Sequence, residues 1–131
     1  MPVIAFDITA REPYAGGRSF GSTGAYEQVT GGLTFAADPQ HAANRAIVDL
    51  DKAPCDADGR VRFSADFCLL QPVDAGNSAG RLLMDVANRG RKLTVAMYNR
   101  GQRMLEASTA IDPGDGFLFE RGWTLAWVGW Q

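Results

Sequence analysis

The sequence predicts a β-rich α/β fold in which an antiparallel N-terminal part leads into a βαβ unit. Residues 61–70 alternate apolar with polar side chains, which is typical of an antiparallel strand with one buried face. Residues 82–86 and 123–130 are apolar at almost every position, which is typical of strands covered on both faces. Because enough chain separates these two runs for a helical crossover, we expect them to pair in parallel.

The chain up to residue 24 contains one candidate strand, residues 3–9, followed by a loop rich in Gly, Ser and Pro. Residues 26–37 predict a second strand. Within it, Gly31 and Gly32 indicate a bulge or a bend. These two strands begin the antiparallel part of the fold.

A long connection follows, over residues 38–60. Residues 38–45 form a polar turn region that contains His41, and residues 47–50 predict a short strand. Residues 53–59 predict a turn, because Pro54 and the Asp58-Gly59 pair favour turn conformations.

The chain between the two apolar runs at residues 82–86 and 123–130 contains the candidate helical crossover. Residues 91–106 carry apolar side chains at helical spacing, but Gly101 weakens the middle, so we expect a helix in the first half only. Residues 111–116 predict a turn, and residues 117–121 predict one helical turn. Residues 71–80, before the first of the two runs, predict a loop.

Composition and charge describe a globular chain and exclude several kinds of partner. The 131 residues fit one domain or part of one; 46% are hydrophobic and 21% charged, as in folded proteins. A net charge of −2 provides no positive field for nucleic acid or an anionic membrane, so we expect neither partner. The sequence has no long apolar run and no signal-like start, and we expect a cytoplasmic protein.

The cysteine and histidine content argues against a disulfide framework and against a metal centre. Cys55 and Cys68 are the two cysteines, and we expect both to be reduced, with Cys68 buried. The single histidine, His41, leaves too few ligands for a structural zinc site. We expect no metal and no cofactor.

Two motifs resemble functional sites but lack the right context. Ser19 lies in a G-x-S-x-G pattern. A nucleophile elbow needs a buried strand before the serine and a helix after it, and the sequence predicts neither, so a surface loop is favoured. Four aspartates, Asp49, Asp51, Asp56 and Asp58, suggest a calcium loop, but in register with Gly59 the required ligand positions carry Pro54 and Ala65. We interpret the aspartates as solvated turn residues.

A basic stretch allows two interpretations. Its members are Arg89, Arg91, Lys92, Arg100 and Arg103, with no acidic residue among them up to Arg103. They form either a solvated helix face or a contact for an anionic group.

The turn Asn88-Arg89-Gly90 is the strongest candidate site. It follows a predicted parallel strand, and ligands of open α/β sheets bind at the carboxyl ends of such strands. Gly90 permits unusual backbone conformations, and a turn before a helix presents free N–H groups to an oxyanion. The alternative is an ordinary turn in which Asn88 caps the helix.

Four segments together resemble the N-terminal region of the bacterial α/β-hydrolase domain-containing proteins. They are GGRSFGSTGAYEQVTGG (16–32), NRAIVDLDKAPCDADGRVRFSADFCLLQP (44–72), RLLMDVANRGRK (81–92) and GDGFLFERGWTLAWVGWQ (114–131). The resemblance covers most of the chain. It implies that residues 1–80 form a β-rich N-terminal extension and that residues 81–131 begin an incomplete α/β-hydrolase sheet.

The resemblance also implies a chemistry. Residues 82–86 would be the strand that ends in the oxyanion loop, Asn88, Arg89 and Gly90 would form that loop by position, and residues 123–130 would be the next strand. The nucleophile, acid and histidine of this family lie in later sequence, so no catalytic residue is expected here. The complete protein is then expected to hydrolyse small esters, and this chain alone to be inactive and to associate through its exposed sheet.

A different class of function stays open from the residues alone. A free-standing β-rich binding module could use Trp123, Trp127 and Trp130 as a contact surface, because aromatic residues are favoured at binding hot spots. Burial of these side chains in the sheet is the other interpretation.

Overall fold

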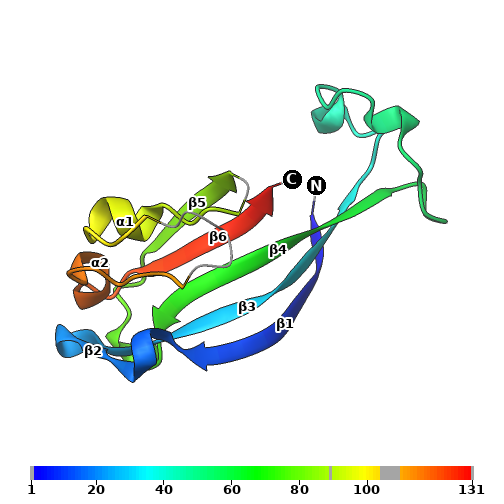
Figure 1. Cartoon of the computed structure of the whole chain (residues 1–131). Coiled ribbons are helices and arrows are strands. Elements are labelled where there is room, and N and C mark those ends of the chain that lie inside the picture. Colours follow the sequence, from blue (N-terminus) through cyan, green and yellow to red (C-terminus); the bar gives the residue numbers. More distant parts are fainter. Residues whose placement is uncertain (1, 89, 104–109, 131) are drawn as a thin grey trace.

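The structure, a computed structural model, describes residues 2–88, 90–103 and 110–130. Its centre is a mixed sheet of six strands (Figure 1). The strands are β1 (Val3–Pro13), β2 (Ser19–Phe20), β3 (Gly24–Ala37), β4 (Val61–Pro72), β5 (Leu82–Asn88) and β6 (Thr124–Trp130). The main strand order is β1-β3-β4-β6-β5, with β2 paired to the start of β3. Strands from both sides of residue 80 therefore share one sheet.

The pairing directions divide the sheet at β6. The ladders β1–β3, β3–β4 and β4–β6 are antiparallel, whereas β5 and β6 are parallel. The predicted antiparallel strand at residues 61–70 and the predicted parallel pair are both confirmed. The coarse prediction of a β-rich α/β fold is confirmed with them.

Short helices connect the strands. Between β5 and β6 lie α1 (Thr94–Tyr98) and α2 (Phe117–Glu120), where the sequence predicted a short helix and one helical turn. Single 3₁₀ turns occur at η1 (Tyr14–Gly17), η2 (Gly21–Thr23), η3 (Ala42–Asn44), η4 (Leu50–Lys52) and η5 (Ala75–Asn77). In the described part of the chain, every helix is too short to cross a membrane.

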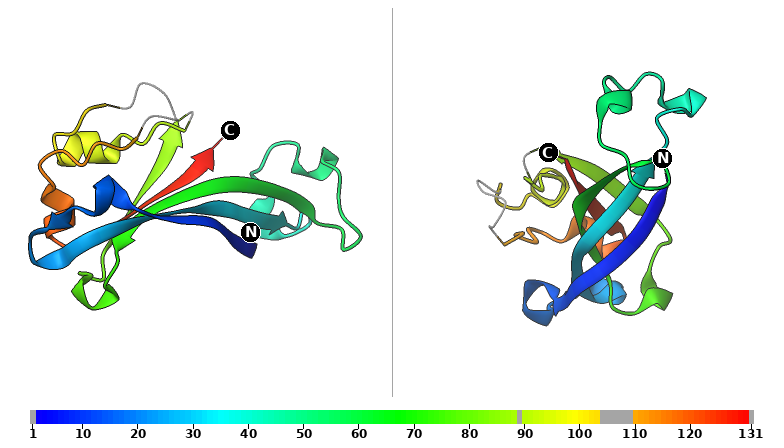
Figure 2. Two further views of the ribbon diagram at one scale, coloured as in Figure 1. Left: turned by 60° about the horizontal axis from the view of Figure 1, so that its bottom comes forward. Right: turned by 90° about the vertical axis from the view of Figure 1, so that its right-hand side faces the viewer.

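One face of the sheet is covered by these helices and by the N-terminal turn. The core on this covered face includes Tyr14 of η1, Val95 of α1, Phe119 of α2 and Trp127 of β6. Figure 2 shows α1 and α2 on the same side of the sheet as η1. Aromatic rings dominate the contact: the Phe119 ring lies edge-on to Tyr14 and is tilted against Phe20 and Tyr26, at centroid distances of 4.9–5.3 Å.

Two buried phenols tie the start of the chain to its end. The Tyr26 hydroxyl lies 3.1 Å from the Phe119 carbonyl oxygen and 3.0 Å from that of Trp123, and the Tyr14 hydroxyl donates to the Ile111 carbonyl. Burial raises the pKa of both phenols, so each remains a neutral donor.

The opposite face, which we call the open face, carries Phe6 of β1, Phe67 of β4 and Met84 of β5. Its small core consists of Val29, Leu33 and Phe67, and the Phe6 ring stacks on Phe67 at 4.4 Å. Toward the β5 edge this face is uncovered. Leu82, Met84 and Val86 are 60%, 55% and 61% exposed.

The predicted burial of residues 82–86 on both faces is therefore wrong for β5. The predicted cover is confirmed at the centre of β6, because Leu125, Ala126 and Trp127 are all buried, so the exposed apolar side chains of this part of the sheet lie on β5 instead. The physical reason is position: β6 lies between β4 and β5, whereas β5 is the edge of the sheet.

Two further local predictions are corrected. Residues 47–50 form turns that lead into η4 instead of a strand. Of the bulge or bend predicted at Gly31 and Gly32, the bulge is wrong for β3, because the β3–β4 register is continuous there and the bulges lie in β1. Gly31 is required for close approach, because a Cβ there would lie 1.9 Å from the Asp7 carbonyl oxygen.

The uncovered β5 row predicts self-association of the 131-residue chain. An apolar edge strand is a template for pairing, and covering its side chains removes apolar surface from water. We expect the double variant Met84→Lys/Val86→Lys to shift the chain toward monomer in sedimentation velocity. Val73→Lys, at a 62% exposed position outside β5, serves as the control. Equal association of both variants would show that β5 is not the contact.

Candidate functional site

The turn at Asn88 and Gly90 lies at the carboxyl end of the parallel pair. In the β5–β6 register, Asn88 is the last residue of β5 and pairs with Trp130. Gly90 has a φ of +70°, a conformation that L side chains rarely adopt, so the predicted need for glycine is met. Arg89 lies outside the described residues. The capping alternative is wrong, because α1 begins at Thr94 with Leu93 at its N-cap position.

A carboxylate that the sequence analysis missed organises this region. Asp85 of β5 faces the covered side, where its Oδ2 atom accepts hydrogen bonds from Thr94 Oγ1 at 2.7 Å and from Trp127 Nε1 at 3.1 Å. Both donors are at least 95% buried. The chain on either side of the Asn88–Gly90 turn is thus fixed, at Asp85 before it and at Thr94 after it. The signal in the sequence was a single acid inside the apolar run LLMDVAN.

The thiol near this network is buried. Cys68 of β4 pairs with Trp127 in the ladder and is 5% exposed. Burial raises the pKa of the Cys68 thiol, and nearby Lys92 offsets only part of that shift. The prediction that Cys55 and Cys68 are unpaired, with Cys68 buried, is confirmed.

Ser19 and His41 lie at opposite ends of the sheet. Ser19 pairs with Ala25 at the start of β3, whereas His41 follows the end of that strand at Ala37. Twelve residues of strand separate these ends, roughly 40 Å. The His41 ring accepts a hydrogen bond from the Ala43 backbone N–H and caps η3. The two residues do not form a catalytic pair in this structure.

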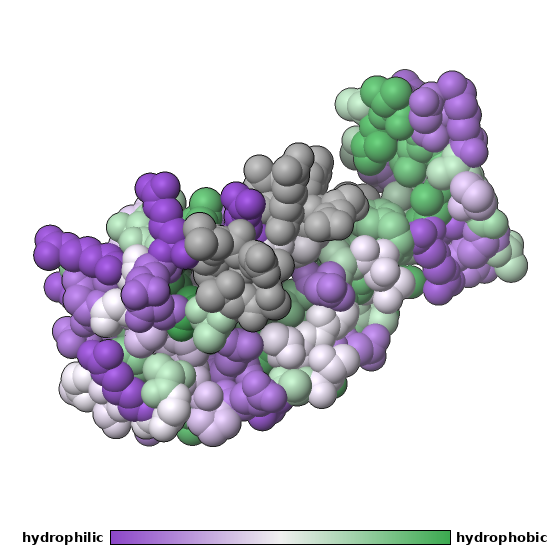
Figure 3. Space-filling view, in the orientation of Figure 1, coloured by the Kyte–Doolittle hydropathy of each residue, from purple (hydrophilic) through white to green (hydrophobic). Residues whose placement is uncertain are grey.

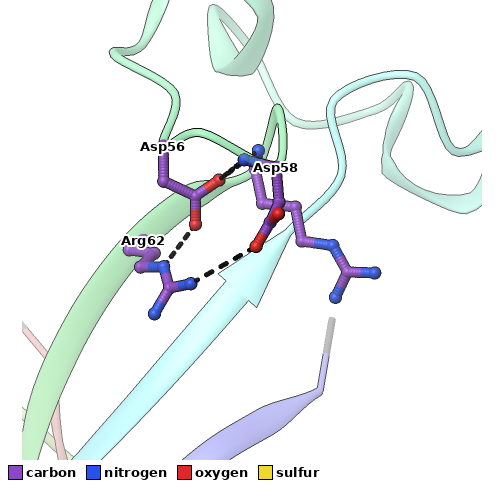
Figure 4. A network of polar contacts seen from close by, with 4 residues as sticks. Asp56, Asp58 and Arg62 are labelled. Atoms are coloured by element: carbon purple, nitrogen blue, oxygen red, sulfur yellow. Dashed lines mark hydrogen bonds and ion pairs between the residues drawn. The ribbon is translucent and has the colours of Figure 1, made fainter.

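The aspartates of residues 49–58 act as turn residues and ion-pair partners. Asp56 accepts hydrogen bonds from the Asp58 and Arg60 backbone N–H groups and from the Arg62 side chain (Figure 4). These bonds, that of Arg62 first, lower the pKa of Asp56. Asp49 pairs with Lys52 at 2.6 Å. Within residues 2–88, 90–103 and 110–130, no three His, Cys, Asp or Glu side chains cluster as metal ligands.

The remaining candidates are distributed over the surface or buried. Arg91, Arg100 and Arg103 are exposed and Lys92 is half-buried. Trp127 is buried and Trp123 is partly buried beneath Arg81, whose guanidinium carbon lies 5.7 Å from the ring centroid. A contact surface built on Trp127 is therefore excluded.

Comparison with protein-family models, curated proteins and solved structures found no match for this chain. A functional assignment of the chain therefore rests on the geometry of its site and on the pattern of its sequence.

The Asp85–Thr94 bond should contribute measurably to stability. We expect a double-mutant cycle of Asp85→Ala and Thr94→Val to give a coupling free energy of about 1–2 kcal/mol, because the bond is charge-assisted and its donor is buried. Urea unfolding measures this coupling, at a protein concentration at which sedimentation velocity shows a monomer. Additive effects of the two changes would contradict the proposed link.

The two thiols should differ in reactivity. In the folded chain we expect iodoacetamide at pH 8 to modify Cys55, which is exposed, and to leave Cys68 unmodified because burial both shields it and raises its pKa. Mass spectrometry of the intact chain should show one adduct in buffer and two in denaturant. Rapid modification of Cys68 in buffer would show that the core around it opens readily.

Proposed function

We propose that this chain is the N-terminal part of an esterase-like serine α/β-hydrolase whose nucleophile, acid and histidine follow residue 131. One observation carries the proposal: the parallel β5–β6 pair, with the positive-φ Gly90 turn at its carboxyl end and α1 after that turn. In α/β-hydrolases such a loop between strand and helix supplies one oxyanion donor. The antiparallel strands β1, β3 and β4 would then be the extension that precedes the catalytic part.

The uncovered row on β5 supports the same proposal. An open α/β sheet normally has helices on both faces, yet Leu82, Met84 and Val86 are more than half exposed. The free edge of β5 is also the place where a further parallel strand could join. Helices and strands of a longer hydrolase would cover both.

The reaction follows from the proposed position of the turn. A serine Oγ outside this chain attacks the ester carbonyl, the histidine accepts its proton, and the alcohol leaves with that proton; water then releases the acid from the acyl-serine. During each attack the carbonyl oxygen becomes negative. A backbone N–H of the Asn88–Gly90 turn is proposed to donate a hydrogen bond to this oxygen. Because an N–H group is uncharged, its burial does not require an ion to leave water. The proposal assigns the enzyme to the cytoplasm, where Cys55 and Cys68 stay reduced.

The product of the complete gene tests the proposal. We expect its sequence after residue 131 to contain a G-x-S-x-G elbow, and a fluorophosphonate probe to label that serine. The 131-residue chain, Ser19 included, should stay unlabelled. Labelling of Ser19 that Ser19→Ala abolishes would contradict the proposal, as would a gene that ends at residue 131 and encodes a monomer with a cooperative melt.

Distortion of the turn should lower turnover. Gly90→Val forces a β-branched side chain into a φ of +70°, so we expect the complete enzyme to lose about 10²–10³-fold in kcat, as for loss of one oxyanion donor. Gly80→Val is the matched control: Gly80 has a φ of +65°, nothing within 4 Å of its Cβ position, and lies before β5. If the Gly90→Val enzyme is folded and keeps full turnover, the turn is not part of the active site.

A further inference from the structure

The β3–β4 hairpin extends well beyond the strands that form the candidate site. Strand β4 pairs with β6 only from Phe67 to Leu70, whereas its pairing with β3 continues for six more residue pairs, to Val61 and Ala37. At about 3.3 Å per residue this extension is roughly 20 Å long. It carries residues 38–60, which we call the distal lobe.

The distal lobe lies at the same end of the sheet as the Asn88–Gly90 turn. Because β4 is antiparallel to β6, the start of β4 lies toward the carboxyl end of β6, and β5 runs parallel to β6. Figure 1 shows the lobe beyond the tips of β5 and β6. This is the end at which open α/β sheets bind their ligands.

Internal hydrogen bonds give the lobe a defined shape. The Asn44 side chain, 8% exposed, donates to the Asp38 carbonyl at 2.7 Å, and the Asp38 carboxylate accepts from the Gln40 N–H at 2.8 Å. At its other end, Asp56 and Arg62 join the lobe to β4 (Figure 4). Such a lobe can present side chains in fixed positions.

The lobe presents apolar side chains to solvent. Val48 is 86% exposed and Ile47 is 41% exposed. Ile47 also lines a cleft of about 270 Å³, with Pro39 and Leu50 as the other apolar residues and Asn44, Arg45 and Asp51 as the polar ones. Figure 3 shows apolar surface on one side of the lobe and polar surface on another. The lobe carries five aspartates against three Lys and Arg, a difference of −2 that disfavours an anionic ligand.

We propose that the distal lobe forms one wall of the substrate entrance and that Ile47 and Val48 bind the aliphatic chain of an uncharged ester. This inference rests on the proposed hydrolase function. The lobe lies beyond the carboxyl ends of β5 and β6, the end of the sheet at which the ester carbonyl would lie against the Asn88–Gly90 turn. The proposal requires that a short acyl group does not reach the lobe and that a long chain contacts it.

Chain-length dependence of the complete enzyme tests this proposal. We compare p-nitrophenyl acetate with p-nitrophenyl octanoate for the wild type, Val48→Asp and Val48→Leu. A carboxylate in an apolar chain site weakens binding of the chain, so Val48→Asp should raise KM for octanoate about tenfold or more and leave the acetate values unchanged. Val48→Leu should keep the wild-type preference.

The matched control is Val73→Asp, at a 62% exposed valine near the opposite end of the hairpin. It introduces the same charge and should change neither KM. If Val48→Asp leaves the octanoate KM unchanged, or raises both KM values equally, the lobe is not a wall for the chain. Absence of turnover by the wild type with either ester would overturn the hydrolase proposal instead, so the two failures are distinguishable.

Discussion

The burial of Trp127 holds the two halves of this sheet together. Its strand, β6, is antiparallel to β4 on one side and parallel to β5 on the other, so no other strand belongs to both pairings. The indole packs in the core beneath the helices and donates its N–H to Asp85. A large apolar ring and one charge-assisted bond thereby fix the relative position of β5, β6 and α1. The Asn88–Gly90 turn lies between β5 and α1, so its position depends on this contact of Trp127 with Asp85.

Sequence periodicity predicted the strands whose environment is set by local pattern. The alternation at residues 61–70 and the two apolar runs were sufficient for β4, β5 and β6, and for the parallel pairing. Periodicity did not predict which of the two apolar strands is buried, because burial depends on packing against elements that are distant in the sequence. Trp127 is buried between two strands, while Met84, equally apolar in pattern, lies on an edge.

The candidate site was predicted only in part, for similar reasons. Gly90 could be singled out because a left-handed turn favours glycine. Asp85 could not, since its hydrogen-bond donors lie nine and 42 residues away in the chain. Ile47 and Val48 suggested a strand by β-propensity. Instead the Asn44 side chain bonds to the Asp38 carbonyl and Asp49 adopts a left-handed conformation, so the chain turns on either side of this pair. The exposed apolar pair of the distal lobe is the result.

The hydroxyl of Tyr26 has a consequence for how the chain folds during synthesis. Its acceptors, the carbonyls of Phe119 and Trp123, lie 93 and 97 residues further along the chain. At about 5–20 residues per second, the ribosome needs roughly 5–20 s to deliver them after Tyr26 has been made. During that interval β3 can pair with β1 and β4, but the residues of α2 that complete the aromatic cluster around Tyr26 are missing. The order of synthesis therefore leaves this part of the core incomplete until residues 119–123 have been made.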